Sequence, residues 1–186
     1  MNKFFSNNYS VINLYNKPSS KSEIVTQMIY GEGFKIINES KKWLKIKIKE
    51  DKYEGYVRKR KFISYLKPTH KVSTLFANVY RKHNLKNKIG KLPYIAKIKV
   101  DNINSKFAKF QDKWIEVKNI KPLNFKNKDI FKDIKIFKKI RYKWGGKTFE
   151  GIDCSALVQV FFNFNNTFCP RDSGQQINFF KKNIDL

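Results

Sequence analysis

The sequence predicts an α+β multidomain protein, in which two small β-barrels precede a mainly helical C-terminal part. Three observations in its 186 residues support this fold class. From about residue 10 to 120, short apolar runs alternate with lysine, which is the period of a half-buried strand. Pro68 divides this region into two units with a similar order of runs. After Pro122 the apolar spacing changes to three and four residues, which indicates helices.

The first unit, residues 10–67, contains runs of β-branched and aromatic residues separated by turn residues. Its clearest strand is WLKIKIK, where Leu44, Ile46 and Ile48 alternate with lysines. Such alternation predicts one buried and one solvent-exposed face of a sheet. We assign the apolar strand residues, and the two tryptophans Trp43 and Trp114, to cores.

The second unit, residues 69–122, repeats this order weakly with FANVY, IGKLPYIAKIKV, FAKF and KWIEV. Each unit has roughly the size of a small barrel, and barrel closure removes the exposed edges that short strands would present.

The third part, residues 123–186, carries three predicted helices. DIFKDIKIFKKIRYK has apolar residues at helical spacing, and DCSALVQVFFNF and SGQQINFFKK follow it. Ser173 and Gln176 have the spacing of a capping box, so we expect the last helix to start at Ser173.

Composition excludes several classes of protein. Hydrophobic residues make up 41% of the chain, which argues against global disorder. The sequence shows no signal peptide and no stretch long and apolar enough for a membrane helix, so we expect a cytoplasmic protein without a membrane partner. Cys154 and Cys169 are too few for a disulfide framework, and with two distant histidines they make no zinc site. We expect no cofactor and no metal, and a packing role for Cys169.

The net charge of +25 comes mostly from lysines spread evenly along the chain. Proteins that read nucleic acid usually concentrate charge on one face and use arginine. We therefore interpret the charge as a solvated basic surface or as attraction to an acidic peptide, and nucleic acid ranks last among the partners.

The candidate catalytic residues lie in the stretch YKWGGKTFEGIDCSALVQVFF, residues 142–162. Gly145-Gly146 and Gly151 provide turns, Asp153 occupies an N-cap position, and Cys154 falls in the first turn of an apolar helix. Unpaired N–H groups at a helix start favour a thiolate and can hold a developing oxyanion. A free cysteine alone is more often a small buried hydrophobe, so the surrounding residues decide the interpretation.

Those residues resemble the NlpC family of papain-like cysteine peptidases. The resemblance covers about residues 130–180, with Ala156 where the family usually has glycine. It rests on Tyr142, Trp144-Gly145-Gly146, Gly151-Ile152-Asp153-Cys154-Ser155, and Pro170-Arg171-Asp172-Ser173 with Gln176.

The two N-terminal units resemble bacterial SH3-like domains. The resemblance uses Asn13-Leu14-Tyr15, Pro18-Ser19, Trp43 and Gly55-Tyr56-Val57 in the first unit, and Asn78-Val79-Tyr80 and Lys113-Trp114-Ile115 in the second. This order of domains is similar to the branch that cleaves the bond between γ-D-glutamyl and diamino acid residues in peptidoglycan stem peptides.

The resemblance implies roles for six residues. Cys154 would be the nucleophile, and Tyr142 would lie near the oxyanion site. Asp153 and Ser155 flank the nucleophile and, with Asp172 and Ser173, would bind substrate, the latter pair near its free amine. Asp172 and Ser173 would alternatively serve only to cap a helix. The first unit is expected to help close the site, and Glu54 and Tyr56 are its suggested contacts.

The same resemblance implies a catalytic histidine after Cys154, yet His70 and His83 both precede it. A thiol peptidase needs a general acid for the leaving amine. We therefore expect a C-terminally truncated chain, inactive by itself, whose helices expose apolar side chains, dock on the N-terminal units or are poorly stable. The phenylalanines concerned are Phe161, Phe162, Phe164, Phe179 and Phe180. The alternative is a non-catalytic protein that binds cell-wall peptides.

Overall fold

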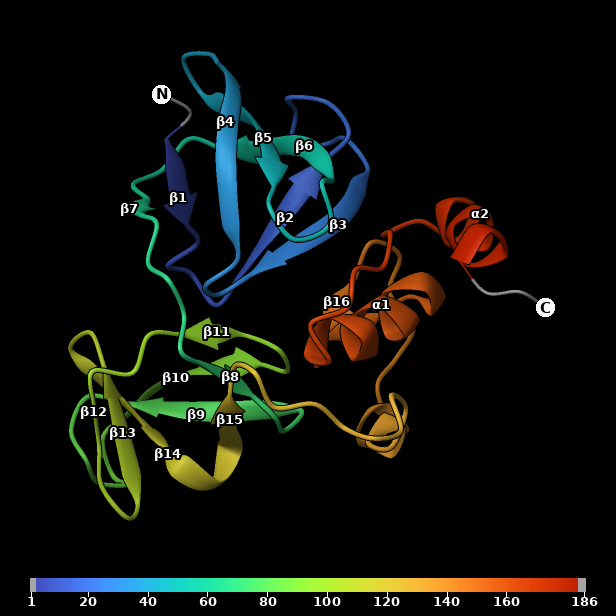
Figure 1. Cartoon of the computed structure of the whole chain (residues 1–186). Helices are drawn as coiled ribbons and strands as arrows, with labels where there is room; N and C mark the ends of the chain where they lie inside the picture. The colour runs from blue at the N-terminus through green and yellow to red at the C-terminus, as the bar shows by residue number, and fades with distance from the viewer. Residues whose placement is uncertain (1–2, 184–186) are drawn as a thin grey trace.

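The computed structural model describes residues 3–183 and shows a mostly β protein with two α-helices near its C-terminal end (Figure 1). Two groups of strands, drawn in blue to cyan and in green to yellow, lie one above the other in Figure 1. The orange and red helical part lies beside both of them. The predicted α+β class is confirmed at this level.

The N-terminal group is one antiparallel sheet of seven strands in the order β3-β2-β6-β5-β4-β1-β7. This group begins before residue 10, the predicted start of the first unit. Its first strand, Phe4–Ser6, pairs with both β4 and β7. The strands are β1 (Phe4–Ser6), β2 (Val11–Tyr15), β3 (Ile24–Ile29), β4 (Gly33–Glu39), β5 (Trp43–Ile48), β6 (Glu54–Arg58) and β7 (Ile63–Ser64).

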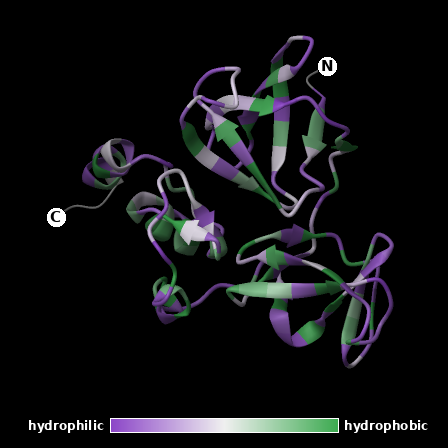
Figure 2. Ribbon diagram, turned by 180° about the vertical axis from the view of Figure 1, so that it is seen from behind, coloured by the Kyte–Doolittle hydropathy of each residue, from purple (hydrophilic) through white to green (hydrophobic). Residues whose placement is uncertain are grey.

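The predicted alternation is present in β5, where Leu44, Ile46 and Ile48 are buried and the residues between them are half-buried. Figure 2 shows such alternation as green and purple bands along the strands. The assignment of Trp43 and Trp114 to cores is wrong, since both are only half-buried. Each precedes a buried residue of its strand, Leu44 or Ile115, and therefore lies on the opposite face from that residue. The core of this sheet consists of Ile12, Leu14, Met28, Phe34, Leu44, Ile46, Ile48 and Val57.

The second group comprises a five-stranded sheet, β10-β9-β14-β13-β12, and a three-stranded sheet, β11-β8-β15. Its core includes Val72, Leu92 and Phe110. The strands are β8 (His70–Val72), β9 (Phe76–Tyr80), β10 (Lys88–Pro93), β11 (Lys97–Ile98), β12 (Asn102–Ile103), β13 (Phe107–Phe110), β14 (Lys113–Glu116) and β15 (Ile120–Pro122), with a 3₁₀ turn η1 (Val117–Asn119).

The C-terminal part contains α1 (Cys154–Phe164), α2 (Ser173–Asn183) and a small hairpin of β16 (Lys147–Thr148) and β17 (Gly151–Ile152). The predicted helix starts at Cys154 and at Ser173 are confirmed. The Gln176 side-chain amide donates to the carbonyls of Ser155 and Pro170, which ties α2 to the start of α1.

The helix predicted over DIFKDIKIFKKIRYK is wrong. This segment forms turns around a short 3₁₀ helix, η2 (Ile134–Phe137). Its isoleucines disfavour a long helix, and its lysines would repel each other at helical spacing. Phe137 is nevertheless buried against α1, so the apolar residues serve the core without a regular helix.

Helix α1 packs between the two N-terminal groups. Its core cluster combines Phe161 and Phe164 with Ile29 of β3 and with Tyr94, which follows β10. The rings of Tyr94 and Phe164 stack at 5.1 Å between centroids. Docking on the N-terminal units is therefore confirmed for α1. Apolar side chains also remain exposed, among them Ile177, Phe168 and Ile134.

Lys71 of β8 holds the C-terminal end of α1. Its Nζ donates to the carbonyls of Leu123 and Phe125 at 2.8 and 2.6 Å, and also to that of Phe164. A cation suits this end of a helix because the last carbonyls carry partial negative charge. Within residues 3–183, neither helix is long and apolar enough to cross a membrane.

Candidate active site

Cys154 is the first residue of α1 and its side chain is exposed. Asp153 caps the helix, since its carboxylate accepts the N–H of Ala156 at 2.8 Å. The first N–H groups of a helix lack intrahelical acceptors. Across the described residues, no acceptor is recorded for the N–H groups of Cys154 and Ser155. The thiol therefore lies beside two free N–H donors.

A buried arginine fixes the Asp153 cap. Arg171 donates to both carboxylate oxygens of Asp153, at 3.0 Å from Nη1 to Oδ1 and 2.6 Å from Nη2 to Oδ2. Its Nε donates to the hydroxyl of Thr26 in β3, and Nη1 also donates to Ser155. The loop before α2, the start of α1 and the N-terminal sheet are thus joined at one guanidinium.

Gly145 allows the loop before the hairpin to lie against β3. Its φ is +69°, and an added Cβ would come within 2.2 Å of the carbonyl oxygen of Ile24. Only glycine suits such a conformation and approach. The Gly145 N–H donates to Asp153 at 3.0 Å, so this close approach also supports the cap.

The thiol opens into a pocket of about 250 Å³ at the junction with the N-terminal sheet. All six residues that the family resemblance singled out line this pocket together. Sequence reasoning missed Glu23, Val25 and Tyr53, and it named Trp144 and Arg171 as motif residues without giving them a role. The complete lining is Glu23, Val25, Tyr53, Tyr142, Trp144, Asp153, Cys154, Ser155, Arg171, Asp172 and Ser173.

The suggested contacts Glu54 and Tyr56 do not line this pocket. Glu54 pairs with Lys45 and Lys47 on the exposed side of the sheet. Tyr53 reaches the pocket instead, from the turn before β6. No motif marked it, because only the packing of the turn against the C-terminal part brings it there.

Two pocket carboxylates, Glu23 and Asp172, form no ion pair within residues 3–183, although the Arg171 guanidinium acts electrostatically on Asp172. Glu23 accepts the indole N–H of Trp144 at 2.7 Å. Asp172 accepts a hydrogen bond from the Tyr53 hydroxyl, and burial raises the pKa of Asp172 above its usual range. Burial also raises the pKa of Tyr53, to about 12, so this hydroxyl remains a donor. Among the described residues, no ion pair is recorded for either carboxylate.

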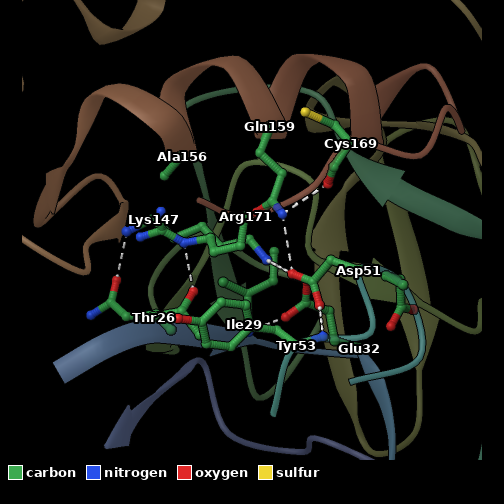
Figure 3. A network of polar contacts seen from close by, with 12 residues as sticks. Thr26, Ile29, Glu32, Asp51, Tyr53, Lys147, Ala156, Gln159, Cys169 and Arg171 are labelled. Atoms are coloured by element: carbon green, nitrogen blue, oxygen red, sulfur yellow. Dashed lines mark hydrogen bonds and ion pairs between the residues drawn. The ribbon is translucent and has the colours of Figure 1, made fainter. Parts of the chain in front are cut away.

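A buried polar network beneath the pocket connects the N-terminal sheet to α1 (Figure 3). The ammonium of Lys147 lies 2.8 Å from Glu32 and 3.9 Å from Asp51. Gln159 of α1 donates to Asp51 and to the carbonyl of Cys169. Asp51 accepts the N–H of Tyr53 at 3.0 Å, so the network also orients a pocket residue.

Neither histidine lines the pocket. His70 contacts the hydroxyl of Thr69, and the ring of His83 packs on Trp114. Cys169 is fully buried, and burial raises its pKa to about 11, in agreement with a packing role. Over residues 3–183, no cluster of side chains is suited to hold a metal ion.

Two parts of the chain match known sequence families. Residues 14–62 match the bacterial dipeptidyl-peptidase SH3 domain, and residues 139–186 match the NlpC/P60 family. A γ-D-glutamyl-L-lysine dipeptidyl-peptidase of Bacillus subtilis (strain 168) is 26% identical over 176 residues. The alignment covers 82% of this chain and 57% of that protein, so the chain spans little more than half of the relative's length.

A solved structure has a similar fold. It is an NlpC/P60 family protein from Bacillus cereus ATCC 10987, which superimposes with a TM-score of 0.79 at 17% identity. The superposition covers 94% of this chain and 76% of that one. The arrangement of the strand groups and the two helices is therefore that of a known fold.

Proposed function

Since the chain is of the NlpC type, with an SH3 domain ahead of its NlpC/P60 segment, we propose that it belongs to a cysteine-type hydrolase of peptidoglycan stem peptides. The bond attacked would join γ-D-glutamyl to a diamino acid, in line with the name of the Bacillus subtilis relative. The observation that carries this proposal is an exposed thiol at a helix start, in a pocket where the carboxylates Glu23, Asp153 and Asp172 outnumber the single cation Arg171. In a chain of net charge +25, such a pocket selects for a cationic group.

Cys154 is the proposed nucleophile. Its Sγ attacks the γ-carbonyl carbon of the scissile amide, and the carbonyl oxygen becomes an oxyanion. The N–H groups of Cys154 and Ser155 face this region without recorded acceptors and would hold the oxyanion. Tyr142, which is 62% exposed at the pocket, would add its hydroxyl near the same oxygen.

Asp153 and Ser155 support the nucleophile in this proposal. Both carboxylate oxygens of Asp153 are occupied by Arg171 and backbone donors. The Ser155 hydroxyl donates to Asp153 and accepts from Arg171. Their polar atoms are thus engaged within the protein, and we assign them to positioning α1 beside the substrate.

Asp172 and Ser173 would bind the free amine of the substrate's L-Ala. The Asp172 carboxylate is half-buried and hydrogen-bonded to Tyr53, which fixes its orientation. Glu23, which directly precedes β3, supplies a second carboxylate to the pocket. An ammonium between them would pair with carboxylates that form no ion pair within the described residues, and a charge-assisted hydrogen bond of this kind is about twice as strong as a neutral one.

The domain organisation follows from these roles. We propose a first SH3-like barrel at residues 10–67, extended by β1, that supplies Glu23 and Tyr53 to the site. A second SH3-like barrel at residues 69–122 would support α1 through Tyr94. Residues 123–186 would form the nucleophile-bearing part of a papain-like domain.

The pocket residues include no histidine, so the proton for the leaving amine has no evident donor among them. We propose that these 186 residues bind the peptide and present the thiol but turn it over slowly or not at all. This observation also favours the second candidate, a protein that binds cell-wall peptides without cleaving them.

Calorimetry and product analysis with the tripeptide L-Ala-γ-D-Glu-L-Lys test both candidates. We expect binding that weakens at least about tenfold when the amine is acetylated. Any release of lysine that disappears in Cys154→Ala supports the hydrolase. Binding without release, unchanged in Cys154→Ser, supports the binding protein. Equal affinity for the free and acetylated peptides would contradict amine recognition.

A further inference from the structure

A second concave site lies on the N-terminal sheet, separate from the thiol pocket. It is a groove of about 280 Å³ between strands β2 and β6 and the segment around the hairpin. Tyr142 and Trp144 line the thiol pocket, whereas Lys143 between them lines the groove. The two sites share no lining residue, so they lie on opposite sides of one short segment.

Arginine is concentrated at this groove. Only five of the 40 basic residues are arginine, and Arg171 is buried in the cap of α1. Of the remaining four, Arg58 and Arg60 line the groove. Arg141 donates from Nε to the carbonyl of Glu150, another groove residue. Lysines are spread over the whole chain, so the clustering of arginines is not explained by overall charge.

Aromatic rings hold the two groove arginines in place. The Arg58 guanidinium lies 5.8 Å from the ring centre of Trp43, and that of Arg60 lies 4.9 Å from Tyr9. A guanidinium that rests on a ring keeps the N–H groups of its edge available. In the part of the chain that the structure describes, no ion pair involves Arg58, Arg60 or Lys143.

We propose that this groove binds the carboxylates of an acidic peptide. The planar fork of arginine matches a carboxylate with two parallel hydrogen bonds. Asn13 and Tyr15 on β2 add amide and hydroxyl groups that suit a peptide backbone. Glu150, the one acidic residue of the lining, leaves three cationic residues, Arg58, Arg60 and Lys143, in excess in the groove. The proposal does not depend on catalysis by Cys154.

The test is calorimetry of the full chain with acetylated tri-glutamate at near-physiological salt, for wild type, Arg58→Glu and Arg81→Glu. Arg81 is exposed in the second strand group and does not line this groove. Arg81→Glu is therefore the control, because it changes the net charge by the same amount as Arg58→Glu. We expect Arg58→Glu to weaken binding at least about tenfold and Arg81→Glu to change it little. Arg58→Lys, which keeps the charge but loses the planar fork, should fall between wild type and Arg58→Glu.

Several outcomes would overturn the proposal. Equal weakening by Arg58→Glu and Arg81→Glu would mean attraction to the general positive charge, and so would the absence of saturable binding. Tripolyphosphate that binds more tightly than the peptide, with the same sensitivity to Arg58→Glu, would show that carboxylates are not the preferred ligand. The unfolding midpoint of each variant shows whether it folds, and Arg58→Lys keeps the test decisive if Arg58→Glu does not.

Iodoacetamide labelling of Cys154 provides an independent readout. It should be the same in wild type and Arg58→Glu, because the groove and the thiol pocket have no common residue. Loss of acidic-peptide binding with unchanged labelling supports a separate groove, whereas parallel loss of both overturns it. A failure of the hydrolase proposal would leave the Arg58 result unaffected.

Discussion

Arg171 donates to both carboxylate oxygens of Asp153, and this buried pair ties the start of α1 to the loop before α2. The same guanidinium reaches Thr26 in the N-terminal sheet. The geometry around Cys154 therefore depends on an interaction between three segments that are far apart in sequence.

Replacing Arg171 by Met should destabilise the protein strongly. The variant leaves the Asp153 carboxylate buried without its cation, which costs about 3–5 kcal/mol of unfolding free energy. Urea unfolding measures the loss. Thr26→Val removes only one hydrogen bond of the same guanidinium and should cost about 1–2 kcal/mol. A loss within about 1 kcal/mol for Arg171→Met would mean that the pair is not a main support of the site.

The two cysteines should react very differently with iodoacetamide. Cys154 is exposed, whereas Cys169 is buried and its thiol has a pKa of about 11. Because the thiolate is the reactive form, native protein at about pH 8 should be labelled at Cys154 only. Peptide mass spectrometry locates the label. Cys154→Ser should remain unlabelled until the protein is unfolded, and equal slow labelling of both thiols would contradict an accessible nucleophile.

Replacing Asp172 by Asn should weaken binding of the tripeptide without lowering the stability of the fold. Burial raises the folded-state pKa of Asp172 above its unfolded value, so the unfolded chain releases this proton at lower pH. The carboxylate therefore reduces stability as pH rises between those two pKa values, and it remains unfavourable at neutral pH. The introduced asparagine would still accept from Tyr53, so the variant should be at least as stable as wild type at about pH 7 but bind the tripeptide more weakly.

The pH dependence of tripeptide binding gives a second readout for Asp172. Affinity in wild type should fall as acid protonates Asp172, and the fall should begin at a higher pH than for an ordinary aspartate. Asp172→Asn should lack this step. Asp112→Asn is the matched control, because Asp112 is exposed outside the pocket and the charge change is identical. A stability loss in Asp172→Asn without a change in affinity would indicate a capping role only.

Local signals in the sequence account for most of the fold. Alternation predicted β5, and the glycine-rich run before Cys154 predicted the start of α1, because period and capping act over a few residues. The six residues suggested by family resemblance also lie in one pocket. Their roles stay predictions, as do the two barrels.

The contributions of the N-terminal sheet could not be predicted in the same way. Glu23 lies beside Ile24, which Gly145 approaches closely, and Tyr53 reaches the site through the turn before β6. Contacts of this kind join residues 121 positions apart, as in the pair Trp144–Glu23, and no local pattern records them. The helix predicted around Ile134 failed for another reason, since the apolar spacing there was helical but isoleucines and closely spaced lysines disfavour a helix.

The ion pair between Lys147 and Glu32 should behave as a coupled unit. Both side chains are almost fully buried, at 0% and 2% exposure. Lys147→Met alone leaves Glu32 as an unpaired buried charge and should cost about 3–5 kcal/mol in urea unfolding. The double variant Lys147→Met/Glu32→Gln should recover only part of that loss, because the buried charge of Glu32 is removed while the buried Asp51, 3.9 Å from Lys147 in the wild type, still loses its cation. The exposed pair Lys59–Glu39 provides the comparison, and Lys59→Met there should cost less than about 1 kcal/mol. If the double variant instead loses the sum of both single effects, the two residues contribute independently and the network does not act as one connection between the sheet and α1.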